Sequence, residues 1–248
     1  MFRKTWTTPQ GQYYNLYADM VKQPHLLIAG ATGSGKSVLE NALISTLLYN
    51  SPAQVQFIFI DLKRIELINY KHLPHTLQYA SEQADAVQAL QLAIDIMENR
   101  YKEMQKQHVK QYPGGAVYVV IDELADLMTT NRKAVQPLLQ RIGQVGRAAN
   151  IHLIACSQCP LAVIIPTPIK VNFTGIVGLR TATAQHSRNI IDIKGCELLP
   201  DPVIEHKAQC YYKKGANCTL YNLPMYSPAD VQALINYWTH TKPRIKWI

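Results

Sequence analysis

The chain has 248 residues, of which 48% are hydrophobic and 17% are charged, and it contains no low-complexity tract or internal repeat. This composition excludes a disordered or fibrous chain, and the length is sufficient for one large domain with a sizeable core. The formal net charge of +8 favours a polyanionic partner such as nucleic acid, although many basic proteins bind none.

The first predicted element is a buried strand at Leu26–Ala29, which ends in Gly30. It belongs to the stretch HLLIAGATGSGKSVLENALI, residues 25–44. Apolar residues then recur at helical spacing from Val38 to Leu47, and Ser51-Pro52 ends this helix. The order of strand, glycine-rich loop and helix is the context that a phosphate-binding loop requires.

Strands and helices alternate along the next part of the chain. Ser81 can cap a long helix that Pro113-Gly114-Gly115 ends, and a second helix is predicted around Lys133–Val145, with Pro137 either near its start or kinking it. This alternation predicts an α/β fold with a mainly parallel central sheet flanked by helices. Strands are predicted at Leu26–Ala29, Val55–Asp61, Ala116–Ile121, Ile151–Cys156 and Phe173–Leu179.

The C-terminal part has a different pattern. Gln209–Lys213 and Cys218–Leu223 flank Lys214-Gly215-Ala216-Asn217, which predicts a β-hairpin. Ser227-Pro228 then opens a final helix, and the chain ends in a short basic tail. The fold is therefore expected to end in a hairpin and a helix.

The loop after the first strand matches the phosphate-binding pattern G-x-x-x-x-G-K-[ST]. Backbone N–H groups of such a loop attract phosphate, Lys36 can reach the β and γ phosphates, and the Ser37 hydroxyl can bind Mg²⁺. The alternative is a chance glycine turn. The predicted ATP-binding residues are Gly30, Ala31, Thr32, Gly33, Ser34, Gly35, Lys36, Ser37 and Val38.

Asp122 and Glu123 directly follow the strand AVYVVI. We expect Asp122 to hold Mg²⁺ together with Ser37, and Glu123 to polarise a water molecule, because ligands bind at the carboxyl ends of strands in such folds. The alternative is a pair of acids that cap a helix. A small-molecule kinase needs no such glutamate, since its substrate supplies the nucleophile, so Glu123 favours hydrolysis.

The sequence predicts a cytoplasmic chain with no membrane span. Its first 15 residues contain no apolar core of a signal peptide, and its five cysteines, an odd number, favour reduced thiols. The longest nearly apolar run, Leu153–Pro166, has about 14 residues, fewer than the roughly 20 that a helix needs to cross a bilayer.

At this point the sequence resembles the FtsK/SpoIIIE family of double-stranded DNA translocases, within the wider HerA group. The resemblance extends from about Gln12 to Trp238 and is more specific than a phosphate-binding loop alone. The segments that carry it are DMVKQPHLLIAGATGSGKSV, FIDLKRIEL, MENRYKEM, VVIDELADLM, GRAANIHLIACSQ, SRNIID and the closing hairpin and helix.

The resemblance implies a RecA-like ATPase motor domain at residues 25–240, with a lead-in segment at 1–24 and a basic tail at 241–248. It also implies a homohexameric ring that hydrolyses ATP between subunits and pulls duplex DNA through a central channel. No membrane segment or winged-helix module is evident, which favours a compact motor from a mobile element or a motor that borrows its anchor from a membrane or secretion-system partner.

Several residue roles follow from the resemblance. Arg147 matches the arginine that such motors insert into the neighbouring subunit's site, the alternative being a surface arginine at a helix end. Gln158 matches a polar sensor of the γ-phosphate, the alternative being a buried hydrogen-bonding side chain. Asp61 and Lys63 match the family's D-P-K segment and are assigned no chemistry. The predicted catalytic residues are Lys36, Glu123, Arg147 and Gln158.

The resemblance also suggests where DNA binds. Lys170 and Arg188 fall at positions where the family places basic residues on channel-facing loops, whereas Cys159 and Ala184 replace basic residues at two others. Fewer phosphate contacts predict weaker and more salt-sensitive binding, or compensation elsewhere. Basic residues that can compensate are Lys102, Lys106, Lys110 and Arg180, although a solvated helix face is the favoured alternative for Lys102 and Lys106.

Two functions from different classes remain open at this stage. The first is a P-loop ATPase that uses ATP and Mg²⁺ to move double-stranded DNA, serving DNA transfer or segregation of a mobile element. The second is a nucleotide-gated coupling or docking ATPase that recruits cargo to a secretion or conjugation channel with little translocation of its own; Cys159 and Ala184 favour it.

Overall fold

A computed structural model describes residues 6–7, 13–14, 23–158, 165–223 and 227–240. The predicted tail, most of the predicted lead-in segment, and Cys159 lie outside these residues. The strands are β1 (Trp6–Thr7), β2 (Tyr13–Tyr14), β3 (His25–Ala29), β4 (Val55–Ile60), β5 (Thr76–Ala80), β6 (Ala116–Ile121), β7 (Ile151–Ser157), β8 (Gly175–Gly178), β9 (Gln209–Lys214) and β10 (Asn217–Asn222). The helices are α1 (Lys36–Leu47), α2 (Gln83–Gln107), α3 (Leu124–Val145), α4 (Thr167–Lys170), α5 (Ala184–Ile191) and α6 (Pro228–His240), with 3₁₀ turns η1 (Ile68–Tyr70) and η2 (Cys196–Leu198).

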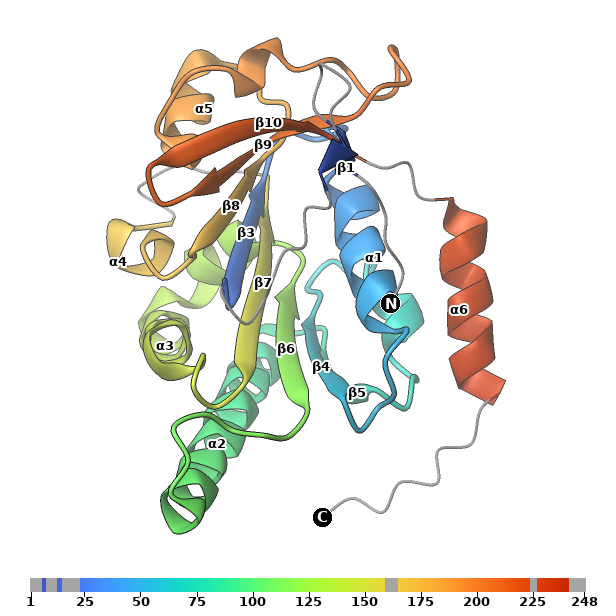
Figure 1. Cartoon of the computed structure of the whole chain (residues 1–248). Coiled ribbons are helices and arrows are strands. Elements are labelled where there is room, and N and C mark those ends of the chain that lie inside the picture. The colour runs from blue at the N-terminus through green and yellow to red at the C-terminus, as the bar shows by residue number, and fades with distance from the viewer. Residues whose placement is uncertain (1–5, 8–12, 15–22, 159–164, 224–226, 241–248) are drawn as a thin grey trace.

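An eight-stranded sheet runs through the centre of the molecule in the order β10-β9-β8-β3-β7-β6-β4-β5 (Figure 1). The six strands β8, β3, β7, β6, β4 and β5 are parallel to one another, whereas β9 pairs antiparallel with β8 and forms an antiparallel hairpin with β10. This arrangement confirms the predicted α/β class and the C-terminal hairpin. Because parallel strands end at one edge of a sheet, the segments that follow β3, β4, β6 and β7 meet there.

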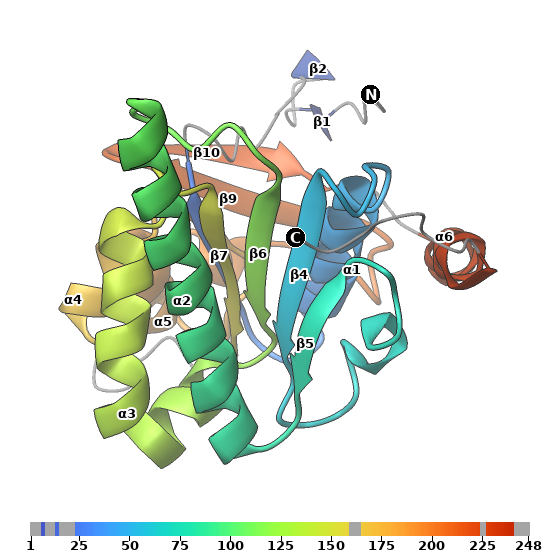
Figure 2. The same ribbon diagram turned by 90° about the horizontal axis from the view of Figure 1, so that it is seen from below.

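Helices cover both faces of the sheet. Figures 1 and 2 show α2 and α3 side by side on one face, and α1 with α6 beside it on the other. The side chains of β3 alternate between two apolar clusters: Leu27 and Ala29 belong to the cluster under α2 and α3, and Leu26 and Ile28 to the cluster under α1. Burial on both faces explains why the central strands are almost continuously apolar in sequence.

The structure corrects the predicted edge of the sheet. The strand β5 was not predicted, because its residues are mostly half-buried and include polar Thr76 and Gln78, so no apolar run marks them. Inside the sheet, β8 at Gly175–Gly178 is shorter than the predicted strand Phe173–Leu179. An edge strand packs fewer apolar side chains than a central one and leaves a weaker sequence signal.

The two longest helices also differ at their ends from the prediction. Glu82 precedes the first turn of α2 where Ser81 is predicted to cap it, and the helix ends at Gln107, before Pro113, because His108 adopts a left-handed conformation at φ 54°. α3 runs from Leu124 to Val145, but non-helical backbone angles at Asn131 break it into two parts. The second part begins close to Lys133, as predicted, with the break at Asn131 and not at Pro137, and the first part was not predicted. Ser227 precedes α6 as predicted, and its hydroxyl accepts the Ala229 N–H at 3.1 Å.

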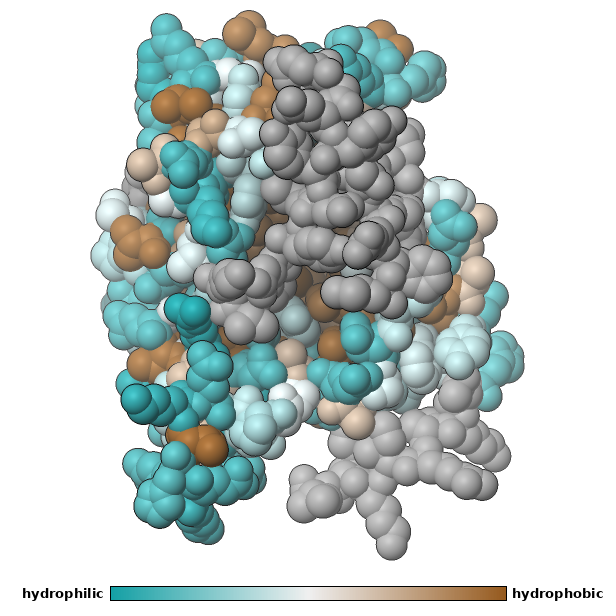
Figure 3. Space-filling view, in the orientation of Figure 1, coloured by the Kyte–Doolittle hydropathy of each residue, from teal (hydrophilic) through white to brown (hydrophobic). Residues whose placement is uncertain are grey.

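On the face shown in Figure 3, hydrophobic residues of the described part of the chain are scattered among hydrophilic ones. Leu198, the last residue of η2, and Val203 and Ile204, between η2 and β9, are strongly exposed apolar residues. Among the described residues, none of the helices combines the length and the apolar character that crossing a membrane requires.

Candidate active site

The predicted phosphate-binding loop connects β3 to α1 at the carboxyl edge of the sheet. Gly33 and Gly35 have φ angles of +78° and +89°, a backbone region that side chains other than glycine rarely adopt. A Cβ atom at either position would meet nothing within 4 Å. The loop therefore presents open backbone to its surroundings, which is what close approach of a phosphate needs.

A cavity of about 460 Å³ lies against this loop. Thr32, Lys36 and Ser37 line one side of it, and the exposed Gln158 at the end of β7 lines another. The cavity thus combines polar groups with an apolar wall, as nucleotide sites do. Apolar lining residues are Val38, Leu39, Pro202, Val203, Ala208 and Leu223.

Lys36 and Asp122 form a buried ion pair beneath the loop. The Lys36 Nζ lies 2.8 Å from Asp122 Oδ1 and 3.1 Å from the Asp122 carbonyl oxygen, and the two side chains are only 6% and 4% exposed. Burial by itself lowers the pKa of Lys36, but Cys156, Glu40 and Asp122 outweigh burial and raise that pKa. Lys36 is therefore a fixed positive charge at the base of the cavity.

Glu123 is held in place by the end of β7. Its Oε1 accepts the Ser157 hydroxyl at 2.9 Å and the Gln158 N–H at 3.1 Å, and it also accepts the Ala125 N–H at 3.3 Å as the cap of α3. Burial raises the pKa of Glu123, against the opposing effect of these hydrogen bonds and of Lys36 and Lys63. The helix-cap role that the sequence left as an alternative is present, and it places the carboxylate beside the cavity.

Gln158 joins Glu123 to the phosphate-binding loop. Its backbone N–H donates to Glu123 Oε2 at 3.0 Å, and its side-chain Oε1 accepts the Thr32 hydroxyl at 3.0 Å. Its side chain is exposed, so the alternative of a buried polar residue does not hold. Gln158 therefore contacts the phosphate-binding loop with its side chain and Glu123 with its backbone.

The turn after β4 brings two residues to the site that sequence reasoning missed. Glu66 Oε1 accepts the Ser37 hydroxyl at 2.6 Å, and Lys63 Nζ lies 3.2 Å from Asp126 Oδ2 and 3.9 Å from Glu123 Oε2. The only signal was their place in FIDLKRIEL, a segment of the family resemblance to which no chemistry was assigned.

These residues fit a nucleotide with a divalent cation. Mg²⁺ prefers oxygen ligands, which Ser37 and Asp122 offer, and the open backbone at Gly33 and Gly35 with Lys36 suits phosphate.

Arg147 lies away from this site within its own chain. It is an exposed residue in the turn between α3 and β7, at the opposite end of β7 from Ser157. The seven residues of β7 span roughly 20 Å at about 3.3 Å per residue. Arg100 of α2 braces this turn by donating to the carbonyl oxygens of Ala149 at 2.8 Å and Asn150 at 3.1 Å.

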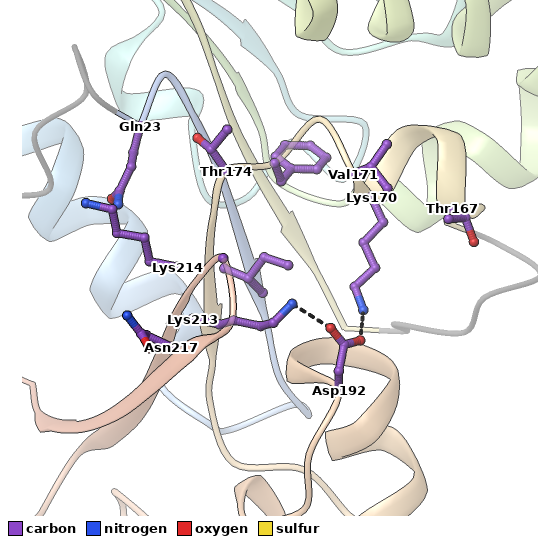
Figure 4. A pocket seen from close by; sticks show the side chains of 12 residues that line it. Gln23, Thr167, Lys170, Val171, Thr174, Asp192, Lys213, Lys214 and Asn217 are labelled. Atoms are coloured by element: carbon purple, nitrogen blue, oxygen red, sulfur yellow. Dashed lines mark hydrogen bonds and ion pairs between the residues drawn. The ribbon is translucent and has the colours of Figure 1, made fainter.

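Figure 4 shows the groove that contains Lys170, one of the two predicted DNA contacts. Lys170 Nζ lies 2.7 Å from Asp192 Oδ1, and Lys213 Nζ, which the sequence did not single out, lies 2.5 Å from Asp192 Oδ2. Burial works against ionisation of Asp192, but the two lysines prevail and lower its pKa. Lys170 thus meets the end of α5, the helix that carries the exposed Arg188.

The basic residues that were predicted to compensate for missing DNA contacts differ in their surroundings. Arg180 donates to Asp201 at 2.9 Å, so its charge is matched within the chain. Lys102, Lys106 and Lys110 are exposed at the end of α2 and just beyond it. Ala184 is the first residue of α5 and adds no charge there.

Residues 8–116 and 114–162 match the FtsK/SpoIIIE family. The chain belongs to this family. It is 39% identical over 202 residues to the DNA translocase FtsK of Streptococcus pneumoniae, covering 73% of this chain and 26% of that protein. It is 37% identical over 242 residues to the DNA translocase FtsK of Lactiplantibacillus plantarum, covering 89% of this chain and 30% of that protein.

Solved structures share the fold. The conjugation coupling protein TcpA of pCW3, in its monomer form with ATPγS, has a TM-score of 0.79 at 24% identity over 94% of this chain and 70% of that one. The type VII secretion ATPase EccC of Thermomonospora curvata has a TM-score of 0.77 at 19% identity over 98% of this chain and 32% of that one. With the family match, these confirm the prediction of a P-loop ATPase. The chain spans under a third of the length of the two FtsK relatives.

Proposed function

We propose that this FtsK/SpoIIIE-family domain is a motor that hydrolyses ATP to move double-stranded DNA as a homohexamer. The observation that carries the proposal is the connected set at the carboxyl edge of the sheet, where Lys36 pairs with Asp122 and Gln158 contacts both Glu123 and Thr32. The FtsK relatives are DNA translocases by name, and the net charge of +8 suits a polyanionic partner.

The side chains divide the work of hydrolysis. Lys36 neutralises phosphate charge, and Ser37 and Asp122 hold Mg²⁺, which when bound neutralises charge on the phosphate oxygens. Glu123 accepts a proton from water and orients its oxygen, since its carboxylate is fixed by β7 and the start of α3. Gln158 lies between Glu123 and the phosphate-binding loop, where a sensor of the γ-phosphate belongs.

Arg147 completes the site of a neighbouring subunit in this proposal. Its distance from the phosphate-binding loop along β7 argues against contact with nucleotide bound to its own chain, and it lies on the surface, where a neighbouring subunit can pack. An arginine supplied by a neighbour stabilises charge on the transferring phosphoryl group and makes hydrolysis depend on assembly.

Lys170 and Arg188 are the proposed contacts to the DNA backbone. Lys170 pairs with Asp192, which directly follows α5, and Arg188 lies one helical turn before Asp192 on that helix. Lys213 adds a second cation beside Lys170 in the groove (Figure 4). Contacts of this kind are independent of sequence and weaken as salt rises.

A coupling or docking ATPase is the second candidate. Asp192 already neutralises part of the charge of Lys170 and Lys213, and Ala184 brings none, which favours weak DNA contact. Such a protein would bind ATP and assemble to present cargo to a membrane or secretion-system partner, with little movement of DNA.

Steady-state ATP hydrolysis with and without duplex DNA, at low and high salt, separates the two candidates. A motor is expected to hydrolyse ATP faster with DNA and to lose this stimulation at high salt. Hydrolysis that is indifferent to DNA at both salt levels would contradict the motor and favour the docking ATPase.

A further inference from the structure

Glu66 is a carboxylate beside the phosphate-binding loop that the proposed function does not use. It is half-buried, it lines the cavity against the phosphate-binding loop, and its Oε1 accepts the Ser37 hydroxyl at 2.6 Å. Glu66 and Ser37 are 29 residues apart and come from different elements, the turn after β4 and the first turn of α1. The contact therefore depends on the fold.

Hydrogen bonds to Asp61 hold the turn that carries Glu66 in place. Asp61, fully buried at the end of β4, accepts the Leu67 N–H at 3.0 Å on Oδ2, and Tyr79 of β5 donates to the same oxygen at 3.1 Å. Leu67, the next residue after Glu66, is itself fully buried. These contacts give Asp61 a structural role and limit where the Glu66 carboxylate can lie.

The direction of the Ser37 hydrogen bond matters for its chemistry. A serine hydroxyl has one proton to donate and two lone pairs with which to accept. Since the Ser37 hydroxyl donates its hydrogen bond to Glu66, both lone pairs of the Ser37 oxygen stay available to a cation on another side of it. Carboxylates that accept a hydrogen bond from a metal ligand fix the orientation of that ligand and increase its basicity.

We propose that Glu66 is a positioning residue that orients the Ser37 hydroxyl toward Mg²⁺. This inference rests on the proposed role of Ser37 as a metal ligand. Mg²⁺ demands near-ideal octahedral geometry, so a ligand held at one angle binds it better than a freely rotating hydroxyl. Glu66 affects Mg²⁺ affinity through Ser37, and phosphate binding by Lys36 does not depend on it.

The experiment is a Mg²⁺ titration of nucleotide binding, with a fluorescent non-hydrolysable ATP analogue as the probe. The Mg²⁺ concentration at half-maximal binding is expected to rise on the order of tenfold in Glu66→Ala and by less in Glu66→Gln, whose amide oxygen still accepts from Ser37. Binding of the analogue in EDTA is expected to be unchanged in both. Glu66→Gln keeps the side-chain shape, so its folding is expected to match the parent.

Two further variants test the route through Ser37. In Ser37→Ala, adding Glu66→Ala is expected to cause no additional shift in Mg²⁺ dependence, because the interaction has already been removed. Glu82→Ala is the matched control: it removes an exposed carboxylate that pairs with Arg64, close to the same turn, and is expected to leave the Mg²⁺ dependence as in the parent.

The outcomes separate this inference from the proposed function. A Mg²⁺ dependence in Glu66→Ala equal to the parent's, with Ser37→Ala impaired, would overturn the role of Glu66 and leave the metal site standing. A full additional shift in the double variant would also overturn it, since Glu66 would then act independently of Ser37. Nucleotide binding by the parent that ignores Mg²⁺ would overturn both.

Discussion

Two lysine–aspartate pairs of nearly equal length lie in different parts of the molecule. Lys36 and Asp122 are 2.8 Å apart under the phosphate-binding loop, and Lys170 and Asp192 are 2.7 Å apart in the groove of Figure 4. The first pair is 6% and 4% exposed, and the second is 22% and 56% exposed. An equal distance therefore joins charges in very different surroundings.

The difference shows that burial, more than distance, decides what each pair can do. A buried pair cannot exchange its partner for water, so loss of one member leaves a charge without compensation. An exposed pair is screened by solvent and salt and contributes little to stability. Lys36 is thus fixed as part of the site, while Lys170 can leave Asp192 for a phosphate at small cost.

Lys36→Ala is expected to give the largest effect, because it removes phosphate binding and also leaves Asp122 buried without its cation. We expect nucleotide binding to be lost and the free energy of unfolding to fall by about 3 kcal/mol, measured by chemical denaturation. The comparison of the two pairs would break if Lys36→Ala and Lys170→Ala destabilised the protein equally.

Glu123→Gln is expected to lower the rate of hydrolysis by on the order of 10²- to 10⁴-fold, since an amide cannot accept the proton of water. Nucleotide affinity is expected to stay within a few-fold of the parent, because the side chain keeps its shape. Single-turnover hydrolysis and equilibrium binding together check this. Unchanged hydrolysis would remove Glu123 from the reaction.

The buried and the exposed carboxylates also differ in how they respond to pH, as Glu40 and Asp192 show. Burial, with the charge of Asp122, raises the pKa of Glu40 to about 8 from an ordinary value of 4.5, whereas two lysines lower the pKa of Asp192. Below pH 4.5 the folded and unfolded chains both hold the proton of Glu40. Between pH 4.5 and 8 the unfolded chain releases it and the folded chain keeps it, so the stability contribution of Glu40 falls as pH rises, by about 1.4 kcal/mol per pH unit.

Glu40→Gln is expected to remove this dependence, since an amide does not titrate. The gain in stability over the parent should therefore be larger at pH 7.5 than at pH 5.5, as measured by urea denaturation at both pH values. A gain that is equal at the two pH values would show that Glu40 is ionised in the folded chain.

Lys170→Ala is expected to give the smallest effect on the isolated chain, a change in unfolding free energy below about 1 kcal/mol. Its effect should appear with DNA instead, as a reduction of about one in the slope of log affinity against log salt. Binding of duplex DNA at several salt concentrations measures this slope. A stability loss as large as that of Lys36→Ala would contradict the account of the exposed pair.

The sequence predicted the candidate site best where its residues are consecutive in the chain. Gly30–Val38 and Asp122-Glu123 could be predicted as candidates because a glycine-rich loop and an acidic strand end are local patterns, and the structure places both at one edge of the sheet. Ser227 was likewise found as the start of the last helix.

Contacts between distant segments were beyond the sequence. Glu66 contacts Ser37, Lys63 approaches Glu123, and Lys213 shares Asp192 with Lys170 because the fold brings together segments that are far apart in the chain. The predicted end of α2 was wrong because His108 adopts a left-handed backbone conformation, which ends the helix before the predicted Pro113-Gly114-Gly115. Completion of the site by Arg147 is a relation between subunits, so it stays a prediction.

Subunit mixing tests the central claim, that the site is completed between chains of a DNA-driven ring. Lys36→Ala has an intact Arg147 but no working site, and Arg147→Ala has a working site but no arginine to complete its neighbour's. We predict that each variant alone is nearly inactive and that an equal mixture regains DNA-stimulated ATP hydrolysis, because roughly a quarter of the interfaces then pair an intact site with an intact arginine. A mixture as inactive as both variants, or Arg147→Ala as active as the parent, would contradict the account.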